Sequence, residues 1–208
     1  MNNKSDSQCK LCRAAGKKLM LKGDRCSSPK CAMVTRQVPP GVHGAKRKNK
    51  VSQFGQQLAE KQHAKFSYGM REKQFRLFFA RAKKSGNAGE NLLRMLEMRL
   101  DNAIYRLGFS VSRPGARQMV NHGMFSINDK KVDIASYIVK PGDVIKIRPS
   151  KKNKKIFAGI EEKIKKAHVP GWLNYDAKEE QAKVLSLPAK EDLDKTINIQ
   201  AIVEFYSK

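Results

Sequence analysis

The sequence predicts an α+β protein: a mainly helical domain with an N-terminal metal-binding arm, plus a module of two helices packed on a small twisted β-sheet. Three observations predict it. Four cysteines are confined to the first 31 of 208 residues. Apolar residues recur with helical spacing between residues 71 and 107, and short alternating stretches bounded by turn residues follow from residue 125. A chain of this length has room for one or two domains with apolar cores.

The four cysteines form a close pair, a loop and a second pair: Cys9, Cys12, Cys26 and Cys31. This spacing is typical of a four-thiolate metal site, and residues 1–45 show no sustained helical or strand period, so we expect a metal ion to organise this arm. Residues 1–8 are polar and do not form the apolar part of a secretory signal, which favours metal over disulfides. Free or redox-active thiols are the other alternative. Zn²⁺ is the expected ion, and an iron–sulfur cluster on the same four cysteines is the alternative cofactor.

The chain is strongly basic, with 43 lysines and arginines against 19 acidic residues and a net charge of +24. Such an excess repels itself, so it predicts a polyanionic partner: nucleic acid first, an acidic membrane surface second. Residues 1–50 hold 13 of the basic and 2 of the acidic residues. No apolar run approaches the roughly 20 residues of a membrane span, and no lipidation motif is present. We therefore expect a cytoplasmic protein without a membrane partner.

The first half of the chain predicts one irregular loop and three helices. Two prolines and two glycines between residues 39 and 44 predict the loop, and the basic residues after it are either a solvated linker or phosphate contacts. Helices are expected over about 53–65 and 71–84, the second with Phe75, Phe78, Phe79 and Ala82 on one apolar face. A longer helix is expected from Leu93 to Leu107, ended by Gly108.

The second half predicts a short helix followed by strands. Pro114 and Gly123 bound the helix. Strands are expected over 125–127 and 131–134, joined by a turn at Asn128-Asp129, and over 144–148. The basic run 151–155 is either a linker or a phosphate contact. Further expectations are a helix over 156–166, a turn over 170–173 whose tryptophan packs on a neighbour, and a strand-like stretch over 199–206.

Taken together, these segments resemble the bacterial ribosomal protein S4 family (uS4) over essentially the whole chain. The motifs that carry the resemblance are Leu-Lys-Gly-Asp-Arg-Cys at 21–26, Ser-Pro-Lys-Cys at 28–31, Pro-Pro-Gly at 39–41 with His-Gly at 43–44, Glu-Lys-Gln-Phe-Arg at 72–76, the stretch 99–108, Ala-Arg-Gln at 116–118, the strand from Val144, Pro-Gly-Trp-Leu at 170–173 and Val-Glu-Phe-Tyr at 203–206. Each motif alone is weak, whereas their order and spacing are specific. Gly115, Met124 and Asp129 depart from the family pattern.

The resemblance implies three regions. Residues 1–45 are the four-cysteine metal-binding basic arm and loop, 46–92 a helical domain completed by 158–208, and 93–157 an S4-type RNA-binding module. It also implies a function: a structural constituent of the small ribosomal subunit that binds 16S ribosomal RNA directly, where several helices of the 5′ domain meet. Such a protein helps to nucleate 30S assembly and contributes to translational accuracy near the path by which messenger RNA enters. Contact with small-subunit protein number five is implied too, and some members repress their own messenger.

The resemblance and the basic composition single out candidate RNA-binding residues, and no catalytic residue is expected. On the arm and loop they are Lys10, Arg13, Lys22, Arg25, Lys30, His43, Lys46 and Arg47. On the module they are Arg106, Arg113, Arg117, Asn121, His122, Lys130 and Lys131. The alternative for Arg106 and Arg99 is pairing with Asp101 or Glu97 on their own helix. His43 is alternatively a plain loop residue, and His63 and His168 are expected at the surface.

Two other classes of protein fit less well. An RNA-modifying enzyme with the same module needs a large catalytic domain, whereas only about fifty residues follow residue 157, without a nucleophile and base together. A metal-finger transcription regulator needs a helix for the DNA major groove, which the arm does not predict.

Overall fold

The computed structural model describes residues 7–46, 50–160, 164, 167–177 and 179–207. The chain divides into two compact units, Met1–Gly89 with Lys195–Lys208, and Glu90–Asp194. The sequence predicts that all of 158–208 completes the helical domain, whereas the two units divide this segment after Asp194. The physical reason is that residues 173–184 supply two strands to the sheet of the second unit. The helix predicted over 156–166 lies partly outside the described residues.

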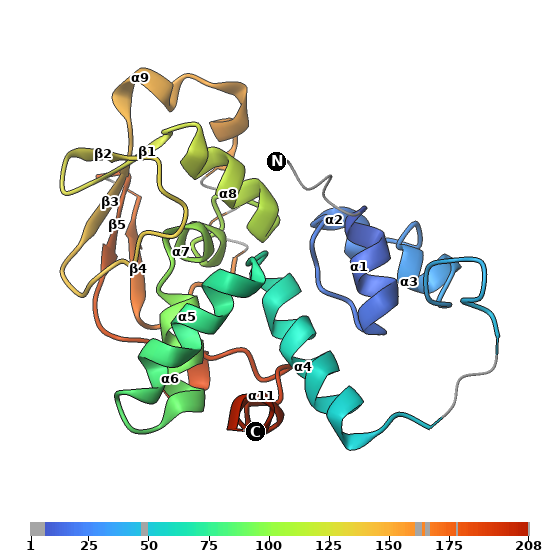
Figure 1. Cartoon of the computed structure of the whole chain (residues 1–208). Coiled ribbons are helices and arrows are strands. Elements are labelled where there is room, and N and C mark those ends of the chain that lie inside the picture. The colour runs from blue at the N-terminus through green and yellow to red at the C-terminus, as the bar shows by residue number, and fades with distance from the viewer. Residues whose placement is uncertain (1–6, 47–49, 161–163, 165–166, 178, 208) are drawn as a thin grey trace. The chain divides into compact units, whose positions relative to one another are not determined.

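The described part of the first unit is built from helices (Figure 1). They are α1 (Gln8–Ala15), α2 (Asp24–Ser27), α3 (Ala32–Thr35), α4 (Gln53–Ser67), α5 (Glu72–Lys83) and α11 (Ile199–Ser207). The helices predicted over 53–65 and 71–84 are confirmed as α4 and α5, and the four apolar residues expected on one face of α5 are buried. Ser52 caps α4, because its hydroxyl oxygen accepts a hydrogen bond from the backbone N–H of Gly55 at 3.2 Å.

The cysteine-bearing arm contains three short helices, although residues 1–45 show no sustained helical period in the sequence. In α1, Leu11 and Ala15 pack around the buried Cys12, together with Leu19 and Leu21 from the next segment. A helix of eight residues is marginal in isolation, so this packing is what stabilises it. The apolar pattern of such a short helix is too brief to be recognised in the sequence.

A carboxylate at the start of α5 links this helix to α4. Glu72 accepts hydrogen bonds from the ammonium groups of Lys61 at 2.7 Å and of Lys65 at 2.8 Å. Partial burial acts to raise the pKa of Glu72, but the two lysines outweigh it and lower the pKa to about 2. His63, which lies on α4, is 3% exposed, so the prediction that it lies at the surface is wrong. His168 is exposed, as predicted.

The C-terminal helix α11 packs against α4 (Figure 1). The strand predicted over 199–206 is therefore wrong. Its β-branched and aromatic residues favour strands locally, but Ile199, Ile202, Val203 and Tyr206 also follow the spacing of a helical face. The helix approaches Gly89 so closely that a Cβ there would lie 2.1 Å from Cγ2 of Ile199. Packing on this surface decides the conformation.

The second unit combines helices with one antiparallel five-stranded sheet, ordered β2-β1-β3-β5-β4. The strands are β1 (Phe125–Ile127), β2 (Lys130–Val132), β3 (Val144–Ile147), β4 (Leu173–Asp176) and β5 (Gln181–Val184). The helices are α6 (Ala88–Glu97), which leads in from the first unit, α7 (Leu100–Arg106), α8 (Arg113–Asn121), α9 (Pro149–Lys152) and the 3-10 helices η1 (Lys155–Phe157) and η2 (Lys190–Asp192). The short helix and the first three strands confirm the prediction, whereas β4 and β5 are additions to it.

The single helix predicted from Leu93 to Leu107 is broken between α6 and α7. Arg99 has an extended backbone, with φ −68° and ψ 139°, and pairs with Ile138. The backbone N–H of Leu100 donates to the carbonyl of Tyr137 at 2.8 Å. The chain therefore exchanges one turn of helix for pairing with a distant segment, which periodicity alone does not reveal.

Two turns fix the geometry around α8. Ser112 caps the helix by accepting from the backbone N–H of Gly115 at 3.3 Å, and Gly123 ends it with a positive φ of 60°. Asn128 and Asp129 have φ values of 48° and 64°, as a type I′ hairpin turn requires. The predicted turn at these two residues is confirmed.

The sheet of the second unit has an apolar and a polar face. Phe125, Ile127 and Ile145 join side chains of α7 and α8 in the core, where Trp172 also lies with 1% exposure, as predicted. The strand register places Lys131, Ser126 and Lys146 in one row across β2, β1 and β3. Because neighbours in such a row share a face, the two lysines lie on the side away from the core.

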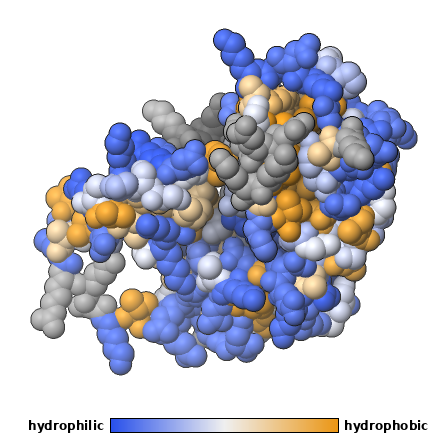
Figure 2. All heavy atoms as spheres, turned by 180° about the vertical axis from the view of Figure 1, so that it is seen from behind, coloured by the Kyte–Doolittle hydropathy of each residue, from blue (hydrophilic) through white to orange (hydrophobic). Residues whose placement is uncertain are grey.

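The surface agrees with the basic, polar composition. Hydrophilic side chains cover most of the face seen in Figure 2, with smaller hydrophobic patches between them. Among the described helices, none combines the length and the apolar composition needed to cross a membrane.

Candidate nucleic-acid interface

A cluster of arginines and carboxylates connects α6, α7 and α8. Arg106 binds Glu97 through two hydrogen bonds, from Nε to Oε2 at 2.8 Å and from Nη2 to Oε1 at 2.9 Å. Glu97 is fully buried, and the side-chain amide of Asn102 donates to its Oε2 at 2.8 Å. The Nε–H of Arg113 donates in turn to Oδ1 of Asn102 at 2.8 Å. These bonds hold the start of α8 against α7.

Asp101 is the second centre of this cluster. It accepts hydrogen bonds from Nε of Arg99 at 3.1 Å, from Nη2 of Arg99 at 2.8 Å and from Nε of Arg117 at 2.8 Å. The side chains of Arg99 and Asp101 are 2% and 5% exposed, and that of Arg117 is 30% exposed. We call the whole cluster the arginine–carboxylate network: Glu97, Arg99, Asp101, Asn102, Arg106, Arg113 and Arg117.

Three of the predicted RNA contacts belong to this network. Arg106, Arg113 and Arg117 all bond to groups of the protein itself. The alternative pairing of Arg106 with Glu97 and of Arg99 with Asp101 is confirmed, although the partners do not share one helix. The side chains of Arg106, Arg113 and Arg117 are 26%, 13% and 30% exposed. In such buried and half-buried pairs, removing one partner would leave a charge without compensation. The pairs therefore hold the helices in a fixed orientation.

The other predicted residues of this unit are exposed. Asn121 and His122 lie at the C-terminal end of α8, and Lys130 and Lys131 on β2. Lys131 also forms an ion pair with Asp133, with 3.0 Å between Nζ and Oδ2, but both side chains are about half exposed. An exposed pair of this kind is weak, so it leaves the lysine able to bind a phosphate.

Arg148, which the sequence analysis does not single out, adjoins this surface. Its Nη1–H donates to the carbonyl of Gly123 at 3.0 Å. A Cβ on Gly123 would lie 2.9 Å from Cε of Lys131 and 3.6 Å from Nη1 of Arg148, so the two cationic side chains converge on the end of α8. The only sequence signal is the position of Arg148 directly after an alternating strand. The partner strand, which brings it to Gly123, is not readable from that pattern.

On the arm of the first unit, the predicted basic residues Lys10, Lys22, Arg25 and Lys30 are exposed. The four cysteines line one small pocket, with Lys22 and Arg25 at its wall. Cys12, Cys26 and Cys31 are buried, and the backbone N–H of Lys22 donates to Sγ of Cys26 at 3.3 Å.

The thiols lie near one another but do not form a closed site. Burial raises the pKa of the Cys12 thiol, and the three other cysteines add to this rise. Within the described residues, no group of three or more histidine, cysteine or carboxylate side chains is arranged so that it could hold a metal ion. The donor set is that of a four-thiolate site.

Arg13 binds the proline loop rather than pointing into solvent. Its Nε donates to the carbonyl of Val38 at 2.7 Å and its Nη2 to that of Pro39 at 3.0 Å. The loop closes tightly, since a Cβ on Gly44 would lie 2.0 Å from the carbonyl oxygen of Pro39. His43 at its tip is exposed.

Two further predicted residues follow the tip of this loop. Lys46 is exposed, and Arg47 lies outside the described residues. Arg13 thus supports a loop whose exposed side chains can face a partner.

Comparisons with known proteins find relatives that match nearly the whole chain. Residues 3–97 match the family described as ribosomal protein S4/S9 N-terminal domain, and residues 98–145 match the S4 domain. A small ribosomal subunit protein uS4 of Caldicellulosiruptor saccharolyticus is 52% identical over 201 residues, 96% of each chain. One of Pelotomaculum thermopropionicum is 50% identical over 203 residues, 97% of each, and a uS4A protein of Clostridium perfringens is 52% identical over 201 residues, 96% of each.

These matches span both units of the structure and nearly the full length of the relatives. The identity is far above what chance or a shared fold alone would give over such a length. The chain therefore belongs to the uS4 family of small ribosomal subunit proteins.

Proposed function

We propose that this chain binds ribosomal RNA directly as a structural constituent of the small ribosomal subunit in the cytoplasm, and that it is not an enzyme. Membership of the uS4 family supports this, as does the net charge of +24. The observation that carries the proposal is the convergence of Lys131 and Arg148 on the end of α8, beside the exposed His122.

These charges adjoin helices whose positions are already fixed, because the arginine–carboxylate network holds α7 and α8 against α6 before any RNA is present. A surface that is already ordered loses little conformational freedom on binding, so more of the phosphate attraction is retained as affinity. A-form RNA presents its backbone and 2′-hydroxyls rather than its base edges, and such a surface suits those groups.

The test is equilibrium binding of the full chain to a transcript of the 16S 5′ domain at increasing salt. With about 6–10 phosphate contacts, the affinity should fall about 10³–10⁵-fold between 50 and 200 mM salt. Lys131→Ala should lower the slope of log affinity against log salt by about one. Lys190→Ala, on the exposed side chain of η2, is the matched control and should leave the slope unchanged. An affinity that does not vary with salt would exclude this mode of binding.

The resemblance supports finer proposals. The RNA target is the junction of several helices in the 5′ domain of 16S RNA, where binding helps to nucleate 30S assembly. The bound protein contacts small-subunit protein number five near the path of the messenger, and so contributes to translational accuracy. Reconstitution of small subunits with and without the chain tests the assembly role, with delayed 5′-domain protection from chemical probes as the expected result. Unchanged protection would reject it.

We also propose that Cys9, Cys12, Cys26 and Cys31 bind one Zn²⁺. Support comes from their common pocket, from the burial of three of them and from the N–H of Lys22 aimed at one sulfur, since such donors favour thiolates. When bound, the ion supplies a cross-link between α1, α2 and the start of α3, which the small apolar cluster supports only weakly.

Elemental analysis of the purified chain should find one zinc per molecule, and a chelator should lower the helical content measured by circular dichroism. Cys26→Ser should reduce zinc content, whereas Ser27→Ala, on the same short helix, should not. An iron–sulfur cluster would instead give a visible absorption band. Metal-free protein with an intact arm would contradict the zinc proposal.

A further inference from the structure

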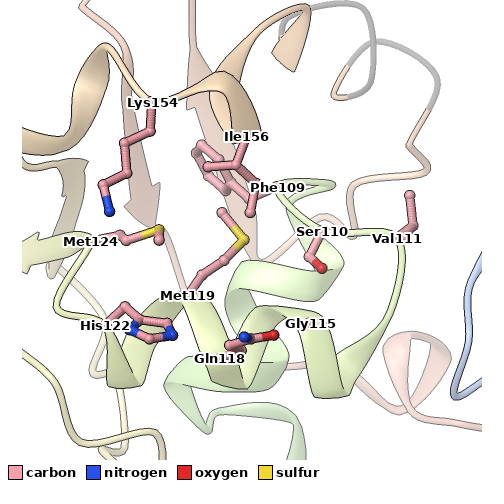
Figure 3. A pocket seen from close by; sticks show the side chains of 10 residues that line it. All are labelled: Phe109, Ser110, Val111, Gly115, Gln118, Met119, His122, Met124, Lys154 and Ile156. Carbon is pink, nitrogen blue, oxygen red and sulfur yellow. The ribbon is translucent and has the colours of Figure 1, made fainter.

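We infer that a cleft beside α8 binds a single unstacked nucleobase together with its phosphate. This inference rests on the proposed RNA-binding function and names what one part of that surface takes. The cleft has a volume of about 360 Å³, near the lower end of the range for ligand sites, about 300–1,000 Å³. Phe109, Gln118, Met119, His122, Met124 and Lys154 are among the residues that line it (Figure 3).

The floor of the cleft is apolar and polarizable. Phe109, Met119 and Met124 are 4%, 2% and 6% exposed, so they are fixed by the core beneath them. The side chains of both methionines line the cleft (Figure 3). Thioether sulfur makes favourable contacts with aromatic rings, and a base that leaves its stack in folded RNA needs an apolar surface to pack on.

The rim of the cleft is polar. Gln118 lies on α8 and His122 directly follows the last residue of this helix; both are exposed and both line the cleft. The amide of Gln118 offers two donors and one acceptor, and the imidazole of His122 a donor and an acceptor. These groups match the edge of a base, which is read by hydrogen bonds once it is unstacked.

The opposite side of the cleft carries a cation. The ammonium group of Lys154 reaches down beside Met124 (Figure 3). Lys154 is exposed and stands in a run of basic residues between α9 and η1. A lysine acts as a point charge for phosphate. An apolar floor, a hydrogen-bonding rim and one cation together suit a nucleotide better than a phosphate alone or an apolar peptide.

The experiment uses the full chain with ¹³C-labelled methionine methyl groups and observes them by NMR. Adenosine 5′-monophosphate is the probe, and ribose 5-phosphate is the control without a base. The probe should shift the methyl signals of Met119 and Met124 by its ring current and leave those of Met70 and Met98 in place, while ribose 5-phosphate should shift none. Gln118→Ala should weaken this binding about threefold to tenfold, the effect of one or two hydrogen bonds. Lys190→Ala, at an exposed residue of η2 that does not line the cleft, should not.

Two outcomes overturn the inference. Equal shifts from both compounds would mean a phosphate site only, and the absence of shifts at Met119 and Met124 would mean no site. Binding of the 16S 5′-domain transcript is measured on the same samples. If transcript binding persists in either case, the cleft assignment fails while the proposed function stands. Loss of transcript binding itself would count against the proposed function.

Discussion

Replacing Asp101 with asparagine removes one negative charge from the arginine–carboxylate network without changing the size of the side chain. Asp101 is the carboxylate that binds Arg99, whose side chain is 2% exposed. Water cannot reach that guanidinium to replace the lost charge, whereas Arg117, 30% exposed, can turn outward. Removing one partner of a buried pair costs about 3–5 kcal/mol. This cost is a large part of the free energy of unfolding of a whole domain, which is about 5–15 kcal/mol.

A matched control uses the same substitution in an exposed pair. Asp133 lies 3.0 Å from Lys131, a distance similar to those in the network, but its side chain is 50% exposed. Asp133→Asn should therefore lower the urea midpoint only slightly. The comparison separates burial from ion pairing as such, because both variants lose one carboxylate charge.

The assay is unfolding in urea, monitored by tryptophan fluorescence. Trp172 is the single tryptophan of the chain and lies in the core of the second unit with 1% exposure, so its signal reports that unit. The midpoint of Asp101→Asn should fall well below that of Asp133→Asn at an unchanged slope. Equal midpoints for the two variants would refute the view that the network fixes α7 and α8.

Three further predictions concern the first unit. The pKa of Glu72 lies near 2, below its ordinary value of 4.5, so its stabilisation is present above about pH 4.5 and lost as the pH falls toward 2; the difference in urea midpoint between the wild type and Glu72→Gln should thus shrink from pH 7 to pH 2.5, and a constant difference would contradict this. Gly89→Ala should lower the thermal midpoint, although alanine usually stabilises a helix, because its Cβ would lie 2.1 Å from Cγ2 of Ile199; a rise would show that α11 moves aside. Arg13→Ala should speed tryptic cleavage at Lys46 and Arg13→Lys should do so partly, since the fork of bonds to the loop carbonyls is lost; equal cleavage rates would mean that the loop holds itself.

The sequence predicts well where periodicity and turn chemistry agree. The apolar face of α5, the Pro114 and Gly123 boundaries of α8 and the turn at Asn128-Asp129 all depend on neighbours within a few residues, and all are confirmed. These local signals are sufficient because each is set by backbone geometry at the residue itself.

Prediction fails where distant segments decide. The break at Arg99 depends on pairing with Ile138, and the helix at 199–207 on the space left by Gly89. Neither partner is visible in a local pattern, and β-branched residues favour a strand in the second case.

The candidate site divides in the same way. The basic residues in the sequence identify the surface, but the sequence does not show which of them bond to other groups of the protein. Arg106, Arg113 and Arg117 resemble RNA contacts in the sequence and are bound to Glu97, Asn102 and Asp101 in the fold. Arg148 is the reverse case, since only the sheet register brings it to Gly123.

The most direct measurement of the central claim is co-sedimentation of the chain with small ribosomal subunits that are washed at increasing salt. A positive surface on ordered helices, bound at many phosphates of folded RNA, should remain with the subunit particles at low salt and be released as the salt rises. Recovery of the chain in the unbound fraction at low salt, with subunits that lack it, would contradict the account.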